Sequence, residues 1–208
     1  MISELYINAS CSIAQNRIIK DGKTFFEKNV EAPQEFLQAA YEHFGLNYPK
    51  FFKMDRLSRL GWLTAEVLLQ DSFQKDKYAP GDTGLVLTNA NSSLDADIKY
   101  YESTRSYASP ALFVYTLPNI VMGEICIRHN FKGENDFFIF ERFNADFLYQ
   151  QVSYLLQKNI LKACICGWVE ILGNHYESVL YLVEKTKGAG GQLFTEETIK
   201  NTYQFANG

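Results

Sequence analysis

Hydrophobic and polar positions alternate near the start of the chain, where residues 4–14 predict a β-strand. The next apolar stretch, residues 18–26, contains an Asp-Gly dipeptide that is typical of a tight hairpin turn. Apolar residues then recur with helical spacing over 34–44 and 55–69, and Asp55 stands where an N-cap is needed. We therefore expect a hairpin followed by two helices.

The rest of the chain alternates short apolar runs with helical patterns. The predicted strands are residues 84–88, 136–140, 163–172 and 178–183, and the predicted helices are residues 95–103, 112–129, 144–159 and 195–205. Such alternation indicates an α/β fold, a layered mixed β-sheet flanked by helices on both faces. No repeat or linker divides residues 1–208, which we interpret as a single domain. The unbroken apolar run Asp136–Phe140 predicts a central strand that is buried on both faces.

The predicted helix 144–159 has apolar residues on two sides. One broad face carries Ala145, Leu148, Tyr149, Val152, Leu155 and Leu156. Phe147 and Tyr154 project from the opposite side, between polar neighbours. A helix that is apolar on two sides is normally buried on two sides, so either a second layer of this chain or a partner must cover it.

Charge and composition exclude several kinds of partner. Twenty basic and 24 acidic residues give a formal net charge of −4 without a basic stripe, which argues against nucleic acid. The longest apolar run, residues 111–123, is interrupted and too short to cross a membrane, and the N-terminus lacks a signal-peptide pattern. We therefore expect a cytoplasmic protein that binds neither nucleic acid nor membranes.

The potential ligating and catalytic side chains are few. Four cysteines occur in apolar segments, and the Cys164-Ile-Cys166 pair has no further ligand nearby, so we expect buried thiols, no metal and no cofactor. His43, His129 and His175 stand in no nucleophile motif, and each is predicted to be a surface or helix-capping residue.

Several segments, in order, resemble the N-terminal half of a β-ketoacyl synthase, a thiolase-fold condensing enzyme. The segments that carry the resemblance are Met54–Arg59, Thr88–Asp97, Ser109–Asn119, Met122–Arg128, Phe131–Gly133 and Leu161–Leu172. The resemblance covers about residues 50–175. It is nearest to the compact ketoacyl-synthase-like proteins that accompany polyene and pigment biosynthesis.

The resemblance implies a catalytic cysteine at a position where this chain has none. In the family, a cysteine nucleophile stands at the N-terminus of the helix that follows a buried strand, where the helix lowers the thiol pKa. The corresponding position falls within residues 140–145, most nearly at Arg142 beside Glu141. Arginine cannot form a thioester. Two interpretations of the pair remain open. In the first, Glu141 is an acidic residue that interacts favourably with the helix dipole beside a solvated Arg142. In the second, the two residues form an ion pair that fills what would be the active-site cavity of the family. The family's C-terminal half, which carries its histidines, also has no counterpart before Gly208.

These departures leave three hypotheses open. The first is a non-catalytic subunit in fatty-acid or polyketide-type biosynthesis, for example of an aryl polyene or pigment. The second is a module that binds an acyl chain or acyl carrier protein, and the third is an acyl-transfer or decarboxylating enzyme that uses Glu141. The family's dimers join through the strand before the nucleophile helix. The chain is accordingly predicted to form a homodimer, or a heterodimer with a full-length ketoacyl synthase, through Phe138, Phe140, Phe147 and Tyr154.

Overall fold

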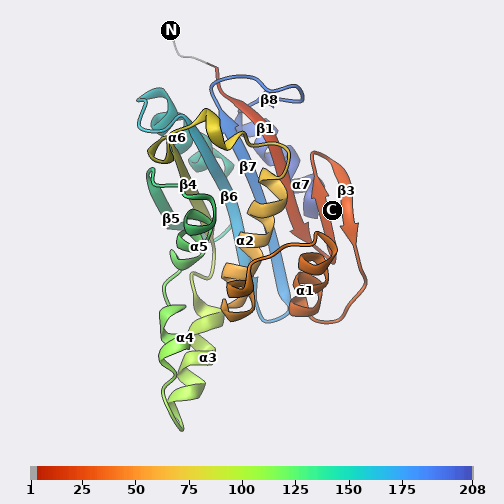
Figure 1. Cartoon of the computed structure of the whole chain (residues 1–208), viewed down its shortest axis with the longest axis vertical. Helices are drawn as coiled ribbons and strands as arrows, with labels where there is room; N and C mark the ends of the chain where they lie inside the picture. Colours follow the sequence, from red (N-terminus) through yellow and green to blue (C-terminus); the bar gives the residue numbers. More distant parts are fainter. Residues whose placement is uncertain (1–3, 208) are drawn as a thin grey trace.

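The computed structural model describes residues 4–207 and contains one mixed sheet with helices on both faces (Figure 1). The sheet consists of β1 (Tyr6–Ala14), β2 (Arg17–Lys20), β3 (Lys23–Glu27), β4 (Thr83–Asn89), β5 (Asn135–Ile139), β6 (Ala163–Leu172), β7 (His175–Glu184) and β8 (Gln192–Leu193). Its strand order is β3-β2-β1-β7-β6-β4-β5, and β8 pairs with β1. Strand β4 runs parallel to β5 and β6, whereas the other pairs are antiparallel.

Seven α-helices of the described residues connect or follow these strands. They are α1 (Pro33–His43), α2 (Arg56–Leu69), α3 (Leu94–Thr104), α4 (Pro110–Val114), α5 (Ile120–His129), α6 (Ala145–Gln157) and α7 (Glu196–Asn207). Short 3-10 helices occur at Pro49–Lys53, Lys75–Lys77 and Pro80–Asp82. The predicted N-cap is confirmed, because the Asp55 carboxylate accepts hydrogen bonds from the first turn of α2.

Each face of the sheet has its own hydrophobic core. Helices α1, α2 and α5 cover one face, with Trp62, Leu63 and Ile165 among the buried residues. Helices α6 and α7 cover the other face, where Leu148, Val152 and Tyr181 are buried. In Figure 1 the first group lies in front of the sheet and α6 and α7 lie behind it. The predicted α/β fold with helices on both faces is confirmed.

Two predictions about the middle of the chain were wrong. Strand β5 is an edge strand rather than a central one, and its side chains are half-buried or exposed. The long helix predicted over 112–129 is two helices, α4 and α5, which are separated at Pro118. Proline has no backbone N–H and clashes with the preceding turn, so the first helix ends before it.

Helices α3 and α4 form a hairpin that projects beyond the end of the sheet (Figure 1). This segment exposes several large apolar side chains, among them Tyr101, Tyr107, Phe113 and Leu117. None of the helices within residues 4–207 combines the length and the hydropathy that a bilayer crossing requires.

Candidate functional site

The candidate site is the unit formed by β5, the loop 140–144 and the N-terminus of α6. The helix begins with Asn144, whose side-chain Oδ1 accepts a hydrogen bond of 3.0 Å from the backbone N–H of Phe147. The loop is tied to the neighbouring strand, because the N–H of Phe140 donates to the carbonyl of Asn89 at 2.9 Å. The loop therefore lies at the carboxyl ends of the parallel strands β4 and β5, where open α/β sheets usually place functional residues.

Glu141 and Arg142 are both exposed in this loop. They line an open depression of about 540 Å³ together with Phe140, Phe143, Asn144, Ala145, Asp146 and Lys200. The structure contains no ion pair between Glu141 and Arg142, so they do not fill an internal cavity as a pair. Two acidic and two basic side chains line the depression, which therefore has no dominant charge.

The cysteines lie outside this depression. Cys11, Cys164 and Cys166 are buried, and burial raises the pKa of each thiol well above its ordinary value. Cys126 is partly buried, and desolvation raises the pKa of its thiol to about 11, although a hydrogen bond to Asn135 opposes this shift. A thiolate nucleophile needs the opposite environment, an electropositive site that lowers the pKa. Within residues 4–207, three or more potential metal-ligating side chains do not come together at one point.

Three of the four predicted interface residues form one aromatic cluster. The ring centroid of Phe147 lies 4.6 Å from that of Phe138 and 4.7 Å from that of Phe140. All three side chains are only partly buried by the chain itself. Tyr154 lies farther along α6 and is 54% exposed. The structure therefore brings Phe138, Phe140 and Phe147 together at the sheet edge, and leaves Tyr154 separate on the outer surface of α6.

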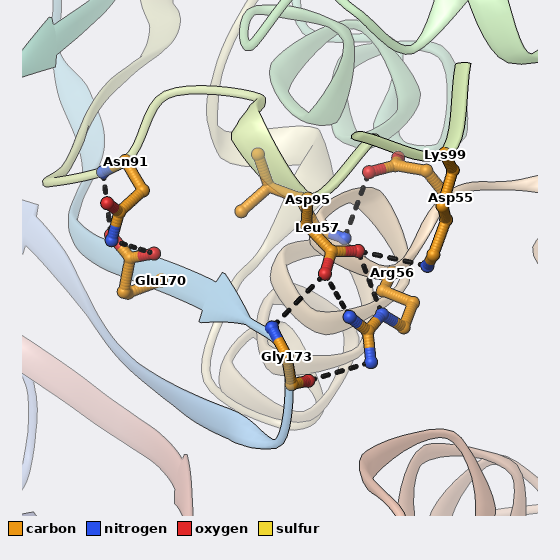
Figure 2. A network of polar contacts seen from close by, with 8 residues as sticks. All are labelled: Asp55, Arg56, Leu57, Asn91, Asp95, Lys99, Glu170 and Gly173. Atoms are coloured by element: carbon orange, nitrogen blue, oxygen red, sulfur yellow. Dashed lines mark hydrogen bonds and ion pairs between the residues drawn. The ribbon is translucent and has the colours of Figure 1, made fainter. Parts of the chain in front are cut away.

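A buried glutamate holds the loop that follows β4. Glu170 of β6 accepts hydrogen bonds from the backbone N–H groups of Ala90 and Asn91 at 2.7 and 3.0 Å. Its other carboxylate oxygen accepts from the Asn91 side chain at 3.1 Å (Figure 2). Because Asn89 in turn binds Phe140, Glu170 also helps to fix the position of the loop 140–144.

A second carboxylate ties the start of the projecting hairpin to α2. Asp95 at the N-terminus of α3 binds the Arg56 guanidinium through two nitrogen atoms and binds Lys99 Nζ at 3.0 Å (Figure 2). It also accepts from the N–H of Gly173 in the β6–β7 turn, while Arg56 donates to the Gly173 carbonyl. Three separate elements therefore meet at one carboxylate. Burial alone would raise the pKa of Asp95, but hydrogen bonds and charge from Arg56 and Lys99 lower it overall.

The loop is also anchored by aromatic packing at Phe143. Phe143 stacks on Tyr203 of α7, with ring centroids 4.0 Å apart, and meets the edge of Trp168. The indole N–H of Trp168 and the hydroxyl of Tyr203 both donate to the same oxygen of Glu177 at 2.9 Å. The loop backbone is thus held from both sides, although Glu141 and Arg142 point into solvent.

Comparison with known proteins defines the fold. No family model matches the sequence, and no curated protein is similar at a significant level. Solved structures do match: the ishigamide ketosynthase/chain length factor gives a TM-score of 0.61 at 15% identity, over 87% of this chain and 62% of that chain. A ketosynthase in complex with its chain length factor from Xenorhabdus doucetiae gives 0.59 at 13% identity, over 99% of this chain and 92% of that chain.

The chain has a ketosynthase fold. A third similar structure, a type II polyketide synthase acyl-carrier protein in complex with its ketosynthase, gives a TM-score of 0.59 at 12% identity. The present chain spans only 62% and 63% of the matched chains in the ishigamide and acyl-carrier-protein structures. The chain matched in the Xenorhabdus complex, by contrast, has nearly the length of this one.

Within the ketosynthase fold, β5 and α6 are the strand and helix predicted to flank the nucleophile position. The connecting loop contains Glu141 and Arg142, the residues that the sequence resemblance places nearest to that position. Sequence reasoning missed Glu170 and Asp95, the two carboxylates that position the surrounding loops. Glu170 is a charged residue inside the apolar run of β6. Because a buried charge needs partners, this position in the sequence could have identified Glu170 as a residue that binds a neighbouring segment.

Proposed function

We propose that this chain is a non-catalytic subunit that pairs with a ketosynthase in polyketide- or fatty-acid-type biosynthesis. The observation that carries the proposal is the unpaired edge of β5 beside the aromatic cluster of Phe138, Phe140 and Phe147. Two of the similar structures join a ketosynthase to a chain length factor, which favours a partner of this kind. The resemblance to the compact proteins of polyene and pigment biosynthesis favours such a pathway.

The residues at the N-terminus of α6 support a non-catalytic role. Condensation through a thioester needs a thiolate beside the depression, and Arg142 and Glu141 cannot supply one. The cysteine thiols have raised pKa values and lie outside the residues that line the depression. An acyl-transfer enzyme that uses Glu141 would need that carboxylate to be oriented by neighbours. Glu141 is exposed, and no hydrogen bond or ion pair within residues 4–207 holds its side chain.

The backbone of β5 is suited to accept another strand. Glu134 and Phe140 exchange hydrogen bonds with β4, so the even-numbered residues of this segment direct their backbone groups toward β4. In a parallel pair only alternate residues bond to one neighbour, and the odd residues Phe137 and Ile139 therefore direct theirs outward. Unpaired N–H and C=O groups of this kind are a template for pairing with a second chain.

The side chains around this edge add apolar surface. Ile139 and Tyr154 are each about half exposed, at 49% and 54%, and the three phenylalanines are partly open to solvent. Covering a continuous patch of several hundred Å² at about 25 cal/mol per Å² contributes several kcal/mol before association costs. A heterodimer that covers both the strand edge and these side chains accounts for the second apolar side of α6.

The proposal is tested by co-purification with a ketosynthase encoded beside this chain's gene, followed by light scattering. The decisive variant is Ile139→Pro, which removes an outward N–H from the edge while leaving the bonds to β4 intact. We expect Ile139→Pro to abolish a complex that Ile139→Val, the matched control, retains.

A complex that survives Ile139→Pro, or a chain that stays monomeric beside every neighbouring ketosynthase, contradicts the proposal. In a separate experiment, acyl carrier protein is added to the isolated chain. Binding of carrier protein by the isolated chain would instead favour a carrier-protein module, and an acyl adduct detected by mass spectrometry would favour an enzyme.

A further inference from the structure

A groove lies between α7 and the β2–β3 turn, on the face of the sheet that α6 and α7 cover. Its volume is about 620 Å³, which is within the range of small-molecule sites. Residues of β1 form its floor together with Ile19 of β2 and Val179 of β7, and the turn residues Asp21 and Gly22 also line it. The groove shares no lining residue with the depression at the N-terminus of α6 and is therefore a separate feature.

The floor of the groove carries two serine side chains. Every second residue of β1, from Ala9 to Ile13, belongs to the core beneath α1 and α2. Successive side chains of a strand point to opposite faces, so Ser10 and Ser12 face the groove. Ser12 stands between Ile19 and Val179, its partners on the two neighbouring strands. The floor is thus a hydroxyl group set between two aliphatic side chains.

The hydroxyl of Ser12 has no partner in the part of the chain that the structure describes. The residue is only 5% exposed, and its side chain forms no hydrogen bond with residues 4–207. The hydroxyls of Thr83 and Ser153 are also unpaired, but they are sealed in the interior, whereas the Ser12 oxygen keeps accessible surface in the groove. Buried hydroxyl groups are normally hydrogen-bonded, so this one is left for a molecule that occupies the groove.

Helix α7 presents a stripe of side chains to the same groove. Its lining residues follow the spacing i, i+3, i+4 and i+7, which places them on one side of the helix: Thr198, Asn201, Thr202 and Phe205. The neighbouring Ile199 is fully buried in the core beneath the helix. The Asn201 amide forms no hydrogen bond within residues 4–207, and the Phe205 ring is 61% exposed. The wall therefore offers a free amide and an open aromatic ring.

The polar groups of the groove are almost all uncharged. Asp21 is the only charged residue among the described residues that line it, and its Oδ1 already accepts a hydrogen bond of 2.8 Å from the N–H of Ser10. Hydroxyl and amide side chains both donate and accept hydrogen bonds. An anionic ligand would lack a cationic partner here, and a wholly apolar ligand would leave Ser12 unpaired. The groove therefore suits a neutral ligand that carries hydroxyl groups.

We propose that this groove binds a neutral carbohydrate. A sugar ring has an apolar face of C–H groups, which packs on the ring of Phe205, and a rim of hydroxyl groups, which exchange hydrogen bonds with Ser12 and Asn201. The stripe on α7 extends over seven residues, or about 10 Å, so the groove is longer than a single side-chain contact requires. The inference does not depend on pairing with a ketosynthase.

The test is a titration of the ¹⁵N-labelled chain, followed in proton–nitrogen correlation spectra. The probes are the neutral disaccharides maltose, cellobiose and lactose, which differ in linkage and stereochemistry. We expect at least one of them to shift the backbone signals of Ser12 and Asn201 saturably and to leave that of Gly133, between α5 and β5, unchanged. Octanoate, an anionic acyl chain, should neither shift these signals nor displace the sugar.

Two variants separate the contributions of the ring and the hydroxyl. Phe205→Ala should weaken binding of the sugar about tenfold, whereas Phe113→Ala, which removes a similarly exposed ring from the α3–α4 hairpin, should leave binding unchanged. Ser12→Ala should weaken binding about fivefold without loss of folding stability, because the hydroxyl has no internal partner to lose.

Three results would overturn the proposal. They are an absence of saturable shifts with every disaccharide at millimolar concentrations, sugar binding that is unchanged in Phe205→Ala or in Ser12→Ala, and octanoate binding at the same signals more tightly than any sugar.

Discussion

At the scale of single residues, the buried carboxylates Glu170 and Asp95 determine where the loops beside the candidate site lie. Glu170 binds two backbone N–H groups after β4, and Asp95 joins α2, α3 and the β6–β7 turn. Both are nearly buried, so removal of either would leave donors without partners in the protein interior. Their energetic role is larger than that of an exposed ion pair.

Replacement of Asp95 by asparagine should lower the free energy of unfolding by about 2 kcal/mol at pH 7, because Arg56 and Lys99 lose their anionic partner. The folded protein lowers the pKa of Asp95, so its contribution is complete above the pKa of an unfolded aspartate, about 3.9. The contribution is lost as the pH falls through the lower, folded value. Urea denaturation of wild type and Asp95→Asn should therefore differ at pH 7 and converge in strong acid.

Asp97→Asn provides the matched control on the same helix. The Asp97 carboxylate accepts only long hydrogen bonds of 3.3 Å from Ser93 and forms no ion pair within the described residues. Its loss should change the free energy of unfolding by less than about 0.5 kcal/mol. A larger effect for Asp97→Asn than for Asp95→Asn would contradict the role assigned to Asp95.

The cysteines should differ in reactivity with iodoacetamide. At pH 8 the native chain should be modified at Cys126 alone, about a hundredfold more slowly than free cysteine, because little thiolate forms when the pKa is about 11. Cys11, Cys164 and Cys166 are buried and should react only after unfolding. Mass spectrometry of partial digests measures each site, and modification of Cys164 before Cys126 would show that β6 is more accessible than its burial indicates.

At the scale of elements, the sequence predicted most helix and strand positions but not the place of β5 in the sheet. Caps and turns are local signals: Asp55, Ser109, Asn144 and Thr195 all accept hydrogen bonds from the helices they precede. The apolar run of β5 gives no such information about its neighbours. An edge strand that is to be covered by a partner has the same composition as a strand buried inside one chain.

The sequence predicted only part of the candidate site, because local patterns do not encode contacts between distant positions. Residues 140–145 were located by resemblance, and the structure places Glu141 and Arg142 before α6 as expected. The contacts of Asp95 with Arg56 and Gly173 join positions that are far apart in the sequence. No local pattern encodes such contacts, and they depend on how β6, α2 and α3 are arranged in space.

The antiparallel pair β6–β7 depends on Gly167. This residue has a φ of +151°, and a Cβ atom there would lie 2.0 Å from the Val179 carbonyl oxygen. Gly167→Ala should therefore cost at least about 3 kcal/mol of unfolding free energy. Gly123→Ala, in the exposed part of α5 where a Cβ meets nothing within 4 Å, should instead stabilise by about 0.5–1 kcal/mol. Thermal or urea unfolding measures the stability of both variants. Equal stabilities would contradict the close contact between residue 167 and the Val179 carbonyl oxygen.

At the scale of the whole molecule, many of the exposed large apolar side chains belong to two regions. One is the edge of β5 with the outer side of α6, and the other is the projecting hairpin of α3 and α4. Both lie along the same side of the molecule in Figure 1. The hairpin begins close to the candidate site, because the carbonyl of Asn89, five residues before α3, binds the N–H of Phe140. A partner seated on the edge of β5 would therefore lie near the base of the hairpin.

Amide hydrogen exchange distinguishes pairing through the strand edge from contact through side chains alone. In the free chain the N–H groups of Phe138 and Phe140 should exchange slowly because they face β4, and those of Phe137 and Ile139 should exchange rapidly. Addition of the ketosynthase should slow Phe137 and Ile139 by a factor of ten or more, as each N–H gains a bond across the interface. Protection confined to α6 or to the hairpin, with Phe137 and Ile139 unchanged, would mean that the partner binds the apolar side chains without extending the sheet.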